Sequence, residues 1–311
     1  MGSPGDPQVD RVGRRLRELA ATPAILDLSR FPGQAPASVI DGVPVCPGVD
    51  LTAIDAWYVR SSPLPLPFQP LRVGPGGIAD VRATKRAFAA GREERSFMTS
   101  FVRAIARLGA TLVNPPDVAT QHFLKLDQLE LLRAAGVPVP RTLASNDPEA
   151  VVEFARGLGG PMVYKPLAGG GMCRRATQAD LRMPRLRALA AAPVLFQEEV
   201  SGANIRVYVV GGDAVASYEI VSKQLDYRGA ETAVHVTALT DAERTSCVAA
   251  ADACGMLFTG IDLRRHPDGS HALLECNPSP MFAAIEQHSG TSAVTDALAA
   301  TLLSARRAPS R

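Results

Sequence analysis

The sequence predicts a protein of mixed α-helices and β-strands arranged in two or three modest domains. Short apolar segments of strand length alternate with segments of helical periodicity, which favours layers of helices on sheets. With 311 residues, of which 46% are hydrophobic, the chain can bury more than one core. A third observation is a pair of apolar strands joined by an Asp-Gly turn within residues 259–282, where several polar side chains gather. We therefore expect an α/β or α+β fold with a site on this hairpin.

Composition excludes several classes of protein. The chain has 33 basic and 31 acidic residues, so its bulk charge does not indicate a nucleic-acid partner. It has no run of about 18 apolar residues, which predicts no membrane span, and its first residues are polar rather than signal-like. Its five cysteines form no CxxC pair. A reduced, cytoplasmic location is the simplest expectation.

The first third of the chain predicts a small α/β layer. We expect helices at 9–20 and at 82–108, the second broken near Gly91, and strands at 24–28, 53–60 and 111–113. Phe97, Phe101, Ile105 and Leu108 are spaced to share one face of the long helix. The segments 31–49 and 61–77 are rich in proline and glycine, so we expect loop or short strands in the first and loop in the second.

The rest of the chain predicts further helices and strands. Proline excludes helix from 137–144, whereas Asp147 and Pro148 are typical of a helix start. We expect helices at 122–135, 148–158, 178–190, 241–254, 281–288 and 292–303, and strands at 161–165, 194–199, 205–210, 214–221, 260–264 and 272–276.

The hairpin predicts a metal site. If its turn centres on Asp268 and Gly269, Asp262 lies directly opposite Glu275, and Asn277 projects from the same face two residues further on. Like charges placed opposite each other are destabilising, and an all-oxygen set suits a hard cation such as Mg²⁺. The alternative is a solvated hairpin whose polar face is simply wet. Cys276 points to the opposite face, where we expect core.

Two lysines indicate an anion site. Lys165 ends an apolar strand and is followed by Gly169, Gly170 and Gly171, whose backbone N–H groups could approach an anion closely. This spacing is not the P-loop pattern. Lys125 lies at a helix start, where a cation opposes the helix dipole unless an anion is near. The alternatives are a surface loop beside a solvated lysine and an ordinary surface lysine.

Three other segments carry polar residues within or next to predicted strands. The strand ending at 196–200 could hold an adenine edge or could be a wet edge. Arg206 lies in a strand otherwise built of Ile, Val and Tyr and needs a partner or ligand there. Lys223 and the cluster 226–228 could close over a phosphate or a substrate carboxylate, or form local ion pairs.

Taken in order, these segments resemble the ATP-grasp superfamily, most closely its RimK-type carboxylate–amine ligases. The resemblance runs from Phe123 to about Gln287, and its matching segments are 125–129, 135–140, 163–166 with the three glycines, 197–200, 204–207, 226–228, Asp262 and 275–280. It implies an ATP-grasp fold in which an N-terminal α/β domain precedes two α+β subdomains that hold the nucleotide between them. The implied boundaries are 1–118, 119–196 and 197–311.

The resemblance also implies a role for each site residue. Lys125 and Lys165 would contact ATP phosphates beneath the glycines 169–171, and the segment from Gln197 through Glu198 and Glu199 to Val200 would hold the adenine. Asp262, Glu275 and Asn277 would bind Mg²⁺, or Mn²⁺ in its place. Arg206 would steady the transferred phosphoryl group, with Lys223 and Arg228 on the substrate side. Asn204 would hydrogen-bond the ribose of ATP. Many relatives carry Asp at this position, and an amide forms a weaker hydrogen bond than a carboxylate does.

The segments 57–60, 114–116 and 226–228 also resemble those of the graspetide, or microviridin-type, peptide maturases. The expected reaction is therefore ATP-dependent ligation: a carboxylate becomes an acyl phosphate, which an amine or hydroxyl of a small molecule or peptide then attacks. A phosphotransferase on the same scaffold and a catalytically silent nucleotide-binding module remain alternatives. We expect no nucleic-acid or membrane partner, and a homodimer is the default oligomer.

Overall fold

The computed structural model describes residues 1–28, 30–60, 81–168, 172–225 and 231–305. The chain divides into two compact units, which we describe separately. The first unit comprises Met1–Thr120 with Leu298–Arg311, and the second comprises Gln121–Ala297. The three-domain boundaries expected from the sequence stay a prediction.

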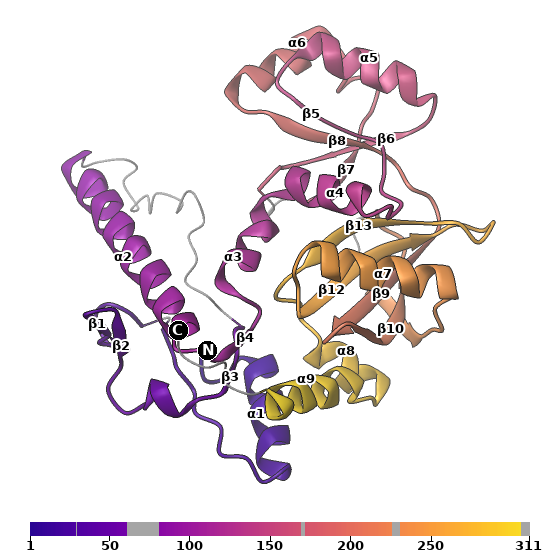
Figure 1. The fold of residues 1–311 in the computed structure, drawn as a ribbon. Helices are drawn as coiled ribbons and strands as arrows, with labels where there is room; N and C mark the ends of the chain where they lie inside the picture. The colour runs from indigo at the N-terminus through magenta and orange to yellow at the C-terminus, as the bar shows by residue number, and fades with distance from the viewer. Residues whose placement is uncertain (29, 61–80, 169–171, 226–230, 306–311) are drawn as a thin grey trace. The chain divides into compact units, whose positions relative to one another are not determined.

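The first unit contains two small sheets and a long helix (Figure 1). Strands β1 (Ser38–Ile40) and β2 (Val43–Val45) pair antiparallel, whereas β3 (Ala56–Tyr58) and β4 (Thr111–Val113) pair parallel. The helices are α1 (Pro7–Glu18), α2 (Val81–Arg107) and the short α3 (Pro116–Ala119), with a 3₁₀ turn at Leu51–Ala53. A second 3₁₀ turn, Thr120–Phe123, begins at the last residue of this part of the chain and continues into the second unit. Helix α1 begins where it does because the Asp6 carboxylate accepts the N–H groups of Gln8 and Val9.

The core of the first unit confirms the expected face of the long helix. Phe101 and Ile105 are fully buried, and Phe97 and Leu108 pack against the same cluster. Helix α2 is continuous, so the predicted break near Gly91 is wrong; a single glycine costs about 1 kcal/mol in a helix, less than the packed face stabilises. The segment 61–77, expected to be loop, lies outside the described residues.

The predicted strand at 24–28 is also wrong. These residues belong to no strand, although Leu26 and Leu28 are buried. The Leu26 carbonyl accepts the Gly2 N–H at 3.1 Å, so the segment docks through its apolar side chains and this backbone contact. An apolar segment of strand length can therefore be buried without joining a strand ladder.

The second unit begins with helix α4 and a four-stranded antiparallel sheet of order β5-β8-β6-β7. The bounds are α4 (Lys125–Ala134), β5 (Thr142–Ser145), β6 (Met162–Lys165), β7 (Arg174–Arg175) and β8 (Val194–Glu198). Helices α5 (Pro148–Leu158) and α6 (Met183–Leu186) cover one face of this sheet (Figure 1), where Val151 and Leu186 pack on Met162 and Phe196.

The helix predicted at 178–190 is shorter than expected. Helix α6 begins at Met183 and continues as a 3₁₀ turn over Arg187–Ala191. Pro184 explains the difference, because proline is accepted in the first turn of a helix but not in its interior.

A five-stranded antiparallel sheet of order β11-β10-β9-β12-β13 completes the second unit. Its strands are β9 (Ala203–Val210), β10 (Asp213–Ser222), β11 (Glu231–Val236), β12 (Phe258–Arg265) and β13 (His271–Asn277). Helix α7 (Asp241–Ala253) packs on this sheet, and α8 (Ala283–Ser289) follows it in the chain (Figure 1). Helix α9 (Ala293–Ser304) begins in the second unit and ends in the first. Strand β11 was not expected from the sequence.

No helix in the described part of the chain is long and apolar enough to cross a membrane.

Candidate active site

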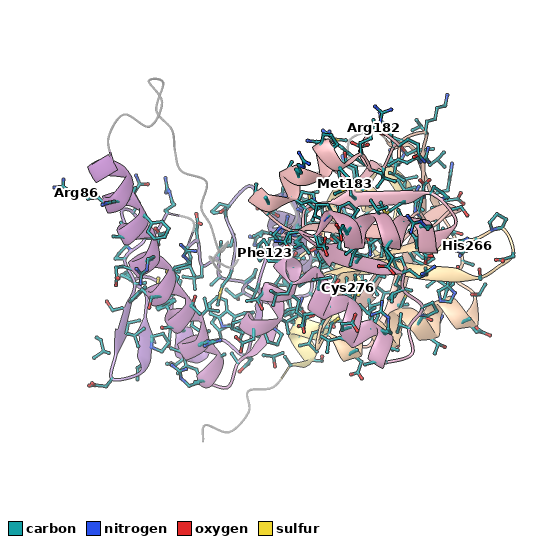
Figure 2. The ribbon with its side chains drawn as sticks, turned by 90° about the horizontal axis from the view of Figure 1, so that it is seen from above. Arg86, Phe123, Arg182, Met183, His266 and Cys276 are labelled. Carbon is teal, nitrogen blue, oxygen red and sulfur yellow. The ribbon has the colours of Figure 1, made fainter. Side chains whose placement is uncertain are left out.

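The β12–β13 hairpin has the register that its turn predicts. Asp262 lies directly opposite Glu275, which confirms the predicted pairing, and His266 marks the end of the hairpin near the turn (Figure 2). On its other side Asp262 pairs with Arg206 of β9. Three neighbouring strands therefore align one cation and two carboxylates in a row across the sheet.

Each carboxylate of this row contacts a cation. Arg206 Nη1 donates to Asp262 Oδ1 at 2.6 Å, and the two side chains are 10% and 25% exposed. Lys125 Nζ, at the start of α4, contacts Glu275 Oε2, with exposures of 10% and 24%. The positive charge that the opposed carboxylates require is thus supplied in part by the protein itself.

Lys165 joins the same electrostatic cluster from the other sheet of this unit. Burial lowers the pKa of its ammonium and the Lys125 charge lowers it further, whereas the Glu275 and Asp262 carboxylates act in the opposite direction. Burial raises the pKa of Glu275, but Lys125 and then Lys165 outweigh it and lower that pKa overall. The Lys165 ammonium forms no hydrogen bond or ion pair with another described residue, which suits a group that contacts an external anion.

Asn277 lies on the Glu275 face of β13, and its Oδ1 accepts the Ser279 N–H at 2.9 Å. An amide oxygen has two lone pairs, so this bond leaves capacity for a second partner. Cys276 (labelled in Figure 2) is fully buried, which confirms the prediction that it belongs to the core. The described residues contain no cluster of three or more His, Cys, Asp or Glu side chains able to hold a metal, so a metal here needs Asn277 or ligand oxygens besides the two carboxylates.

Gln128 positions Lys125, and sequence reasoning missed it. Its side chain accepts the Cys276 N–H and donates to the Cys276 carbonyl, both at 2.8 Å, and it is 2% exposed. This pair of bonds fixes α4 to β13 beside Glu275. The available signal was a glutamine on the apolar face of a helix, which in a core must be satisfied by a partner.

The end of β8 and the residue after it form hydrogen bonds with neighbouring segments. Gln197 is buried and donates to Thr142 Oγ1 at 3.0 Å, and Glu198 Oε1 accepts the Arg141 N–H at 2.9 Å. The Glu199 carboxylate contacts Arg175 of β7, with an Nε–Oε2 distance of 2.5 Å, and its N–H donates to the Pro161 carbonyl at 2.9 Å. The Glu199 N–H is therefore engaged by the chain, and the adenine-binding role of this segment stays a prediction.

The remaining predicted site residues are less constrained. Asn204 donates to the Ile220 carbonyl at 3.3 Å, Val200 is half-buried, and Lys223 is exposed beyond the end of β10. Gly169, Gly170, Gly171 and Arg228 lie outside the described residues.

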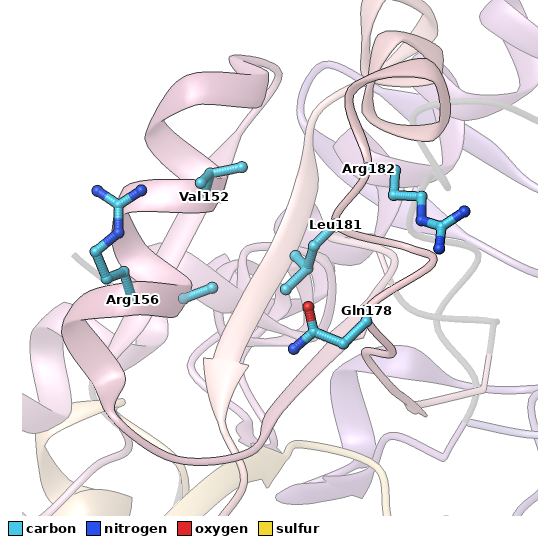
Figure 3. A pocket seen from close by; sticks show the side chains of 6 residues that line it. Val152, Arg156, Gln178, Leu181 and Arg182 are labelled. Atoms are coloured by element: carbon cyan, nitrogen blue, oxygen red, sulfur yellow. The ribbon is translucent and has the colours of Figure 1, made fainter.

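Two hollows in the second unit lie on the helix side of the four-stranded sheet. The larger, of about 470 Å³, is bordered by Val152 and Arg156 of α5 and by Gln178, Leu181 and Arg182 (Figure 3). The smaller, of about 130 Å³, is lined by Tyr164 and Phe196 among others. Because side chains alternate along a strand, Lys165 and Gln197 project from the opposite face. Neither hollow is therefore the predicted nucleotide site.

Comparison with known proteins assigns the chain to a family. Residues 124–301, more than half of the chain, match the model of the RimK-like ATP-grasp domain. A probable alpha-L-glutamate ligase of Teredinibacter turnerae is 30% identical over 203 residues, which cover 62% of this chain and 67% of that protein. One from Vibrio vulnificus is 29% identical over 200 residues, covering 61% and 66%. The matched segment thus spans about two thirds of these relatives.

Solved structures match nearly the whole chain. The ATP-grasp ligase PsnB, complexed with a minimal precursor, has a TM-score of 0.83 and 33% identity, covering 97% of this chain and 96% of that one. The macrocyclase MdnC of Microcystis aeruginosa, bound with precursor peptide MdnA, has a TM-score of 0.79 at 22% identity and shares the fold. The mixed helices and sheets are those of an ATP-using ligase. The chain belongs to the RimK-like ATP-grasp family, and the predicted family, fold class and ATP-dependent ligase activity are confirmed.

Proposed function

We propose that this ligase acts on a peptide, joining side chains within it as esters or amides. The observation that carries the proposal is coverage. The glutamate ligases match 62% of the chain or less, whereas the precursor-bound ligase PsnB matches 97% of it at 33% identity. The likeness to PsnB therefore extends to the N-terminal part of the first unit, residues 1–120, which the family model leaves unmatched. The simplest reason for a likeness that extends beyond the ATP-grasp domain is that the first unit selects the same class of substrate in both proteins.

The charged row on the second sheet supports the nucleotide and metal part of the proposal. Two carboxylates and an amide oxygen on one sheet face form the oxygen donor set that Mg²⁺ prefers, and PsnB has been solved with Mg and ADP. Asp262, Glu275 and Asn277 would hold the ion, and Mn²⁺ could replace it. An ion held by these residues would supply positive charge that offsets the negative charge of the phosphates during phosphoryl transfer.

The chain's own cations would complete the site. Lys125 and Lys165 would bind the phosphates and so hold the nucleotide next to Asp262 and Glu275. Arg206 would hold the transferred phosphoryl group and then the acyl phosphate, while an amine or hydroxyl attacks the acyl carbon and phosphate leaves. Lys223 and Arg228 would face the substrate, and the glycines 169–171 would cover the phosphates. Homodimer formation stays a prediction.

Mass spectrometry of the product tests the function. The protein is co-expressed with each short peptide encoded beside its own gene, and synthetic L-glutamate with an acceptor peptide serves as the comparison. Intramolecular ligation removes one water per bond formed, glutamate ligation adds glutamyl residues, and a kinase adds a phosphoryl group. The proposal predicts water loss that disappears with Asp262→Ala. Glutamyl addition, or a stable phosphopeptide, would contradict it.

A further inference from the structure

Two rows of residues cross the five-stranded sheet on its charged face, and two members of the second row, Tyr208 and Gly260, have not yet been given a role. The first row is Arg206, Asp262 and Glu275. The second, two residues along, pairs Tyr208 of β9 with Gly260 of β12 and Gly260 with Asn277 of β13. Because side chains two apart on a strand share a face, the second row lies directly beside the first.

Gly260 provides the space that the Arg206 guanidinium occupies. A methyl group at Gly260 would lie 2.8 Å from Arg206 Nη2, 2.9 Å from Arg206 Cζ and 2.6 Å from Pro280 Cβ. These separations are shorter than van der Waals contact, so any side chain at Gly260 would displace the guanidinium, the proline or both. The guanidinium therefore lies against the β12 backbone only because that position has no side chain.

Tyr208 supports the same guanidinium from the other direction. The Arg206 Cζ lies 5.6 Å from the centre of the Tyr208 ring, within the range of a cation–π contact. The ring is fully buried, and Tyr208 Oη donates to the Met281 carbonyl at 2.5 Å. Burial raises the pKa of the Tyr208 phenol to about 12, so the hydroxyl stays a donor at neutral pH.

Together these contacts constrain Arg206 more than its ion pair does alone. Asp262 holds Nη1, the ring of Tyr208 supports the guanidinium, and the gap at Gly260 admits Nη2. A flexible arginine is thereby held in a single orientation, while the Tyr208 hydroxyl connects it to the segment that follows Asn277.

We propose that Gly260 and Tyr208 are positioning residues that orient the Arg206 guanidinium toward the phosphoryl group during its transfer. The inference rests on the proposed role of Arg206. It predicts that changes at Gly260 or at the Tyr208 ring weaken binding of the transition state while leaving the binding of ADP largely intact, because only the transferred group meets Arg206.

The test uses MgADP with and without tetrafluoroaluminate, a mimic of the phosphoryl group in transit, with affinity measured by calorimetry. In the parent and in Gly160→Ala, a control glycine with open space around it, the mimic strengthens binding. In Gly260→Ala and in Arg206→Lys, we expect the gain in affinity that the mimic provides to be smaller by about tenfold or more, since a displacement of about 1 Å can lower a rate about a hundredfold. Binding of MgADP alone is expected to be similar in all of them.

The outcomes separate the two proposals. If Arg206→Lys keeps the full gain, the proposed role of Arg206 is wrong and the positioning claim falls with it. If Arg206→Lys loses the gain but Gly260→Ala keeps it, only the positioning claim is overturned. Should thermal melting show that Gly260→Ala is unfolded, Tyr208→Phe and Tyr208→Leu decide. Phenylalanine retains the ring and most of the gain, leucine loses it, and equal behaviour of the two overturns the claim.

Discussion

Replacing Lys125 by glutamine is the most informative single change in the charged site. The substitution removes the ammonium that contacts Glu275 and leaves that carboxylate, 24% exposed, without its closest cation. It also removes one of the two lysines expected to bind phosphate. Stability and nucleotide affinity should therefore fall together, for two different physical reasons.

The size of each effect follows from the burial of the pair. Exposed ion pairs contribute about 0–1 kcal/mol, whereas breaking a fully buried pair costs about 3–5 kcal/mol. With side chains 10% and 24% exposed, the Lys125–Glu275 pair lies between these limits, so we expect a loss of about 1–3 kcal/mol. At about 2–4 °C per kcal/mol for a unit of this size, Tm should fall by roughly 2–12 °C. A lost charge-assisted bond to phosphate of about 1.5–3 kcal/mol weakens ATP binding about ten- to a hundredfold.

Thermal melting and ATP titration measure both effects. The matched control is Arg133→Gln, which removes an exposed ion pair with Glu130 on the same helix, where the side chains are 45% and 70% exposed. This control should leave Tm and ATP affinity close to those of the parent. If Lys125→Gln behaved like Arg133→Gln in both assays, the reasoning about this site would be refuted.

Three further predictions follow from the same structure. Burial and then the Lys125 charge lower the pKa of the Lys165 ammonium, so ATP affinity should fall as the pH rises through this lowered pKa, below the ordinary 10.5. Lys165→Arg should move the loss of affinity to higher pH. If the pH dependence of ATP affinity were the same in both proteins, a contact between Lys165 and phosphate would be contradicted. Gln128→Leu leaves the Cys276 N–H and carbonyl unsatisfied and should destabilise the chain by about 1–3 kcal/mol in denaturant titration, whereas Gln121→Leu, which loses a single bond to the Cys254 carbonyl, should cost less. Burial raises the pKa of Glu243, but hydrogen bonds from Arg265 and Thr240 outweigh burial and lower that pKa below its ordinary value of 4.5. The ionised carboxylate therefore stabilises the fold above pH 4.5, and this stabilisation is lost as the pH falls through the folded-state pKa. The difference in Tm between the parent and Glu243→Gln should shrink in acid, and a difference that stays constant with pH would contradict this prediction.

The hairpin shows what local sequence can predict about this site. An Asp-Gly turn and the two-residue repeat of a strand suffice to place Asp262 opposite Glu275 and Cys276 in the core. The same reasoning could not bring Lys125 to Glu275, because those residues are 150 positions apart and meet only through the packing of α4 on β13. The family resemblance assigned both residues to the ATP and metal site, but it did not predict their contact.

The errors elsewhere have identifiable physical causes. The helix through Gly91 shows tertiary packing overriding a helix breaker. The segment at 24–28 shows that apolar residues of strand length can be buried without pairing in a sheet. Gly260 and Tyr208 were overlooked because their significance lies in what a neighbouring strand presents. A glycine in a strand signals a close approach of other atoms, but sequence does not say which atoms approach.

The central claim is that Asp262, Glu275 and Asn277 hold a divalent ion against the nucleotide phosphates. Titration of ATP into the parent and into Glu275→Gln, each with and without Mg²⁺, tests it directly. The account predicts that Mg²⁺ strengthens ATP binding by the parent and that Glu275→Gln, folded by thermal melting, loses most of that gain. An equal Mg²⁺ dependence in both proteins would contradict it.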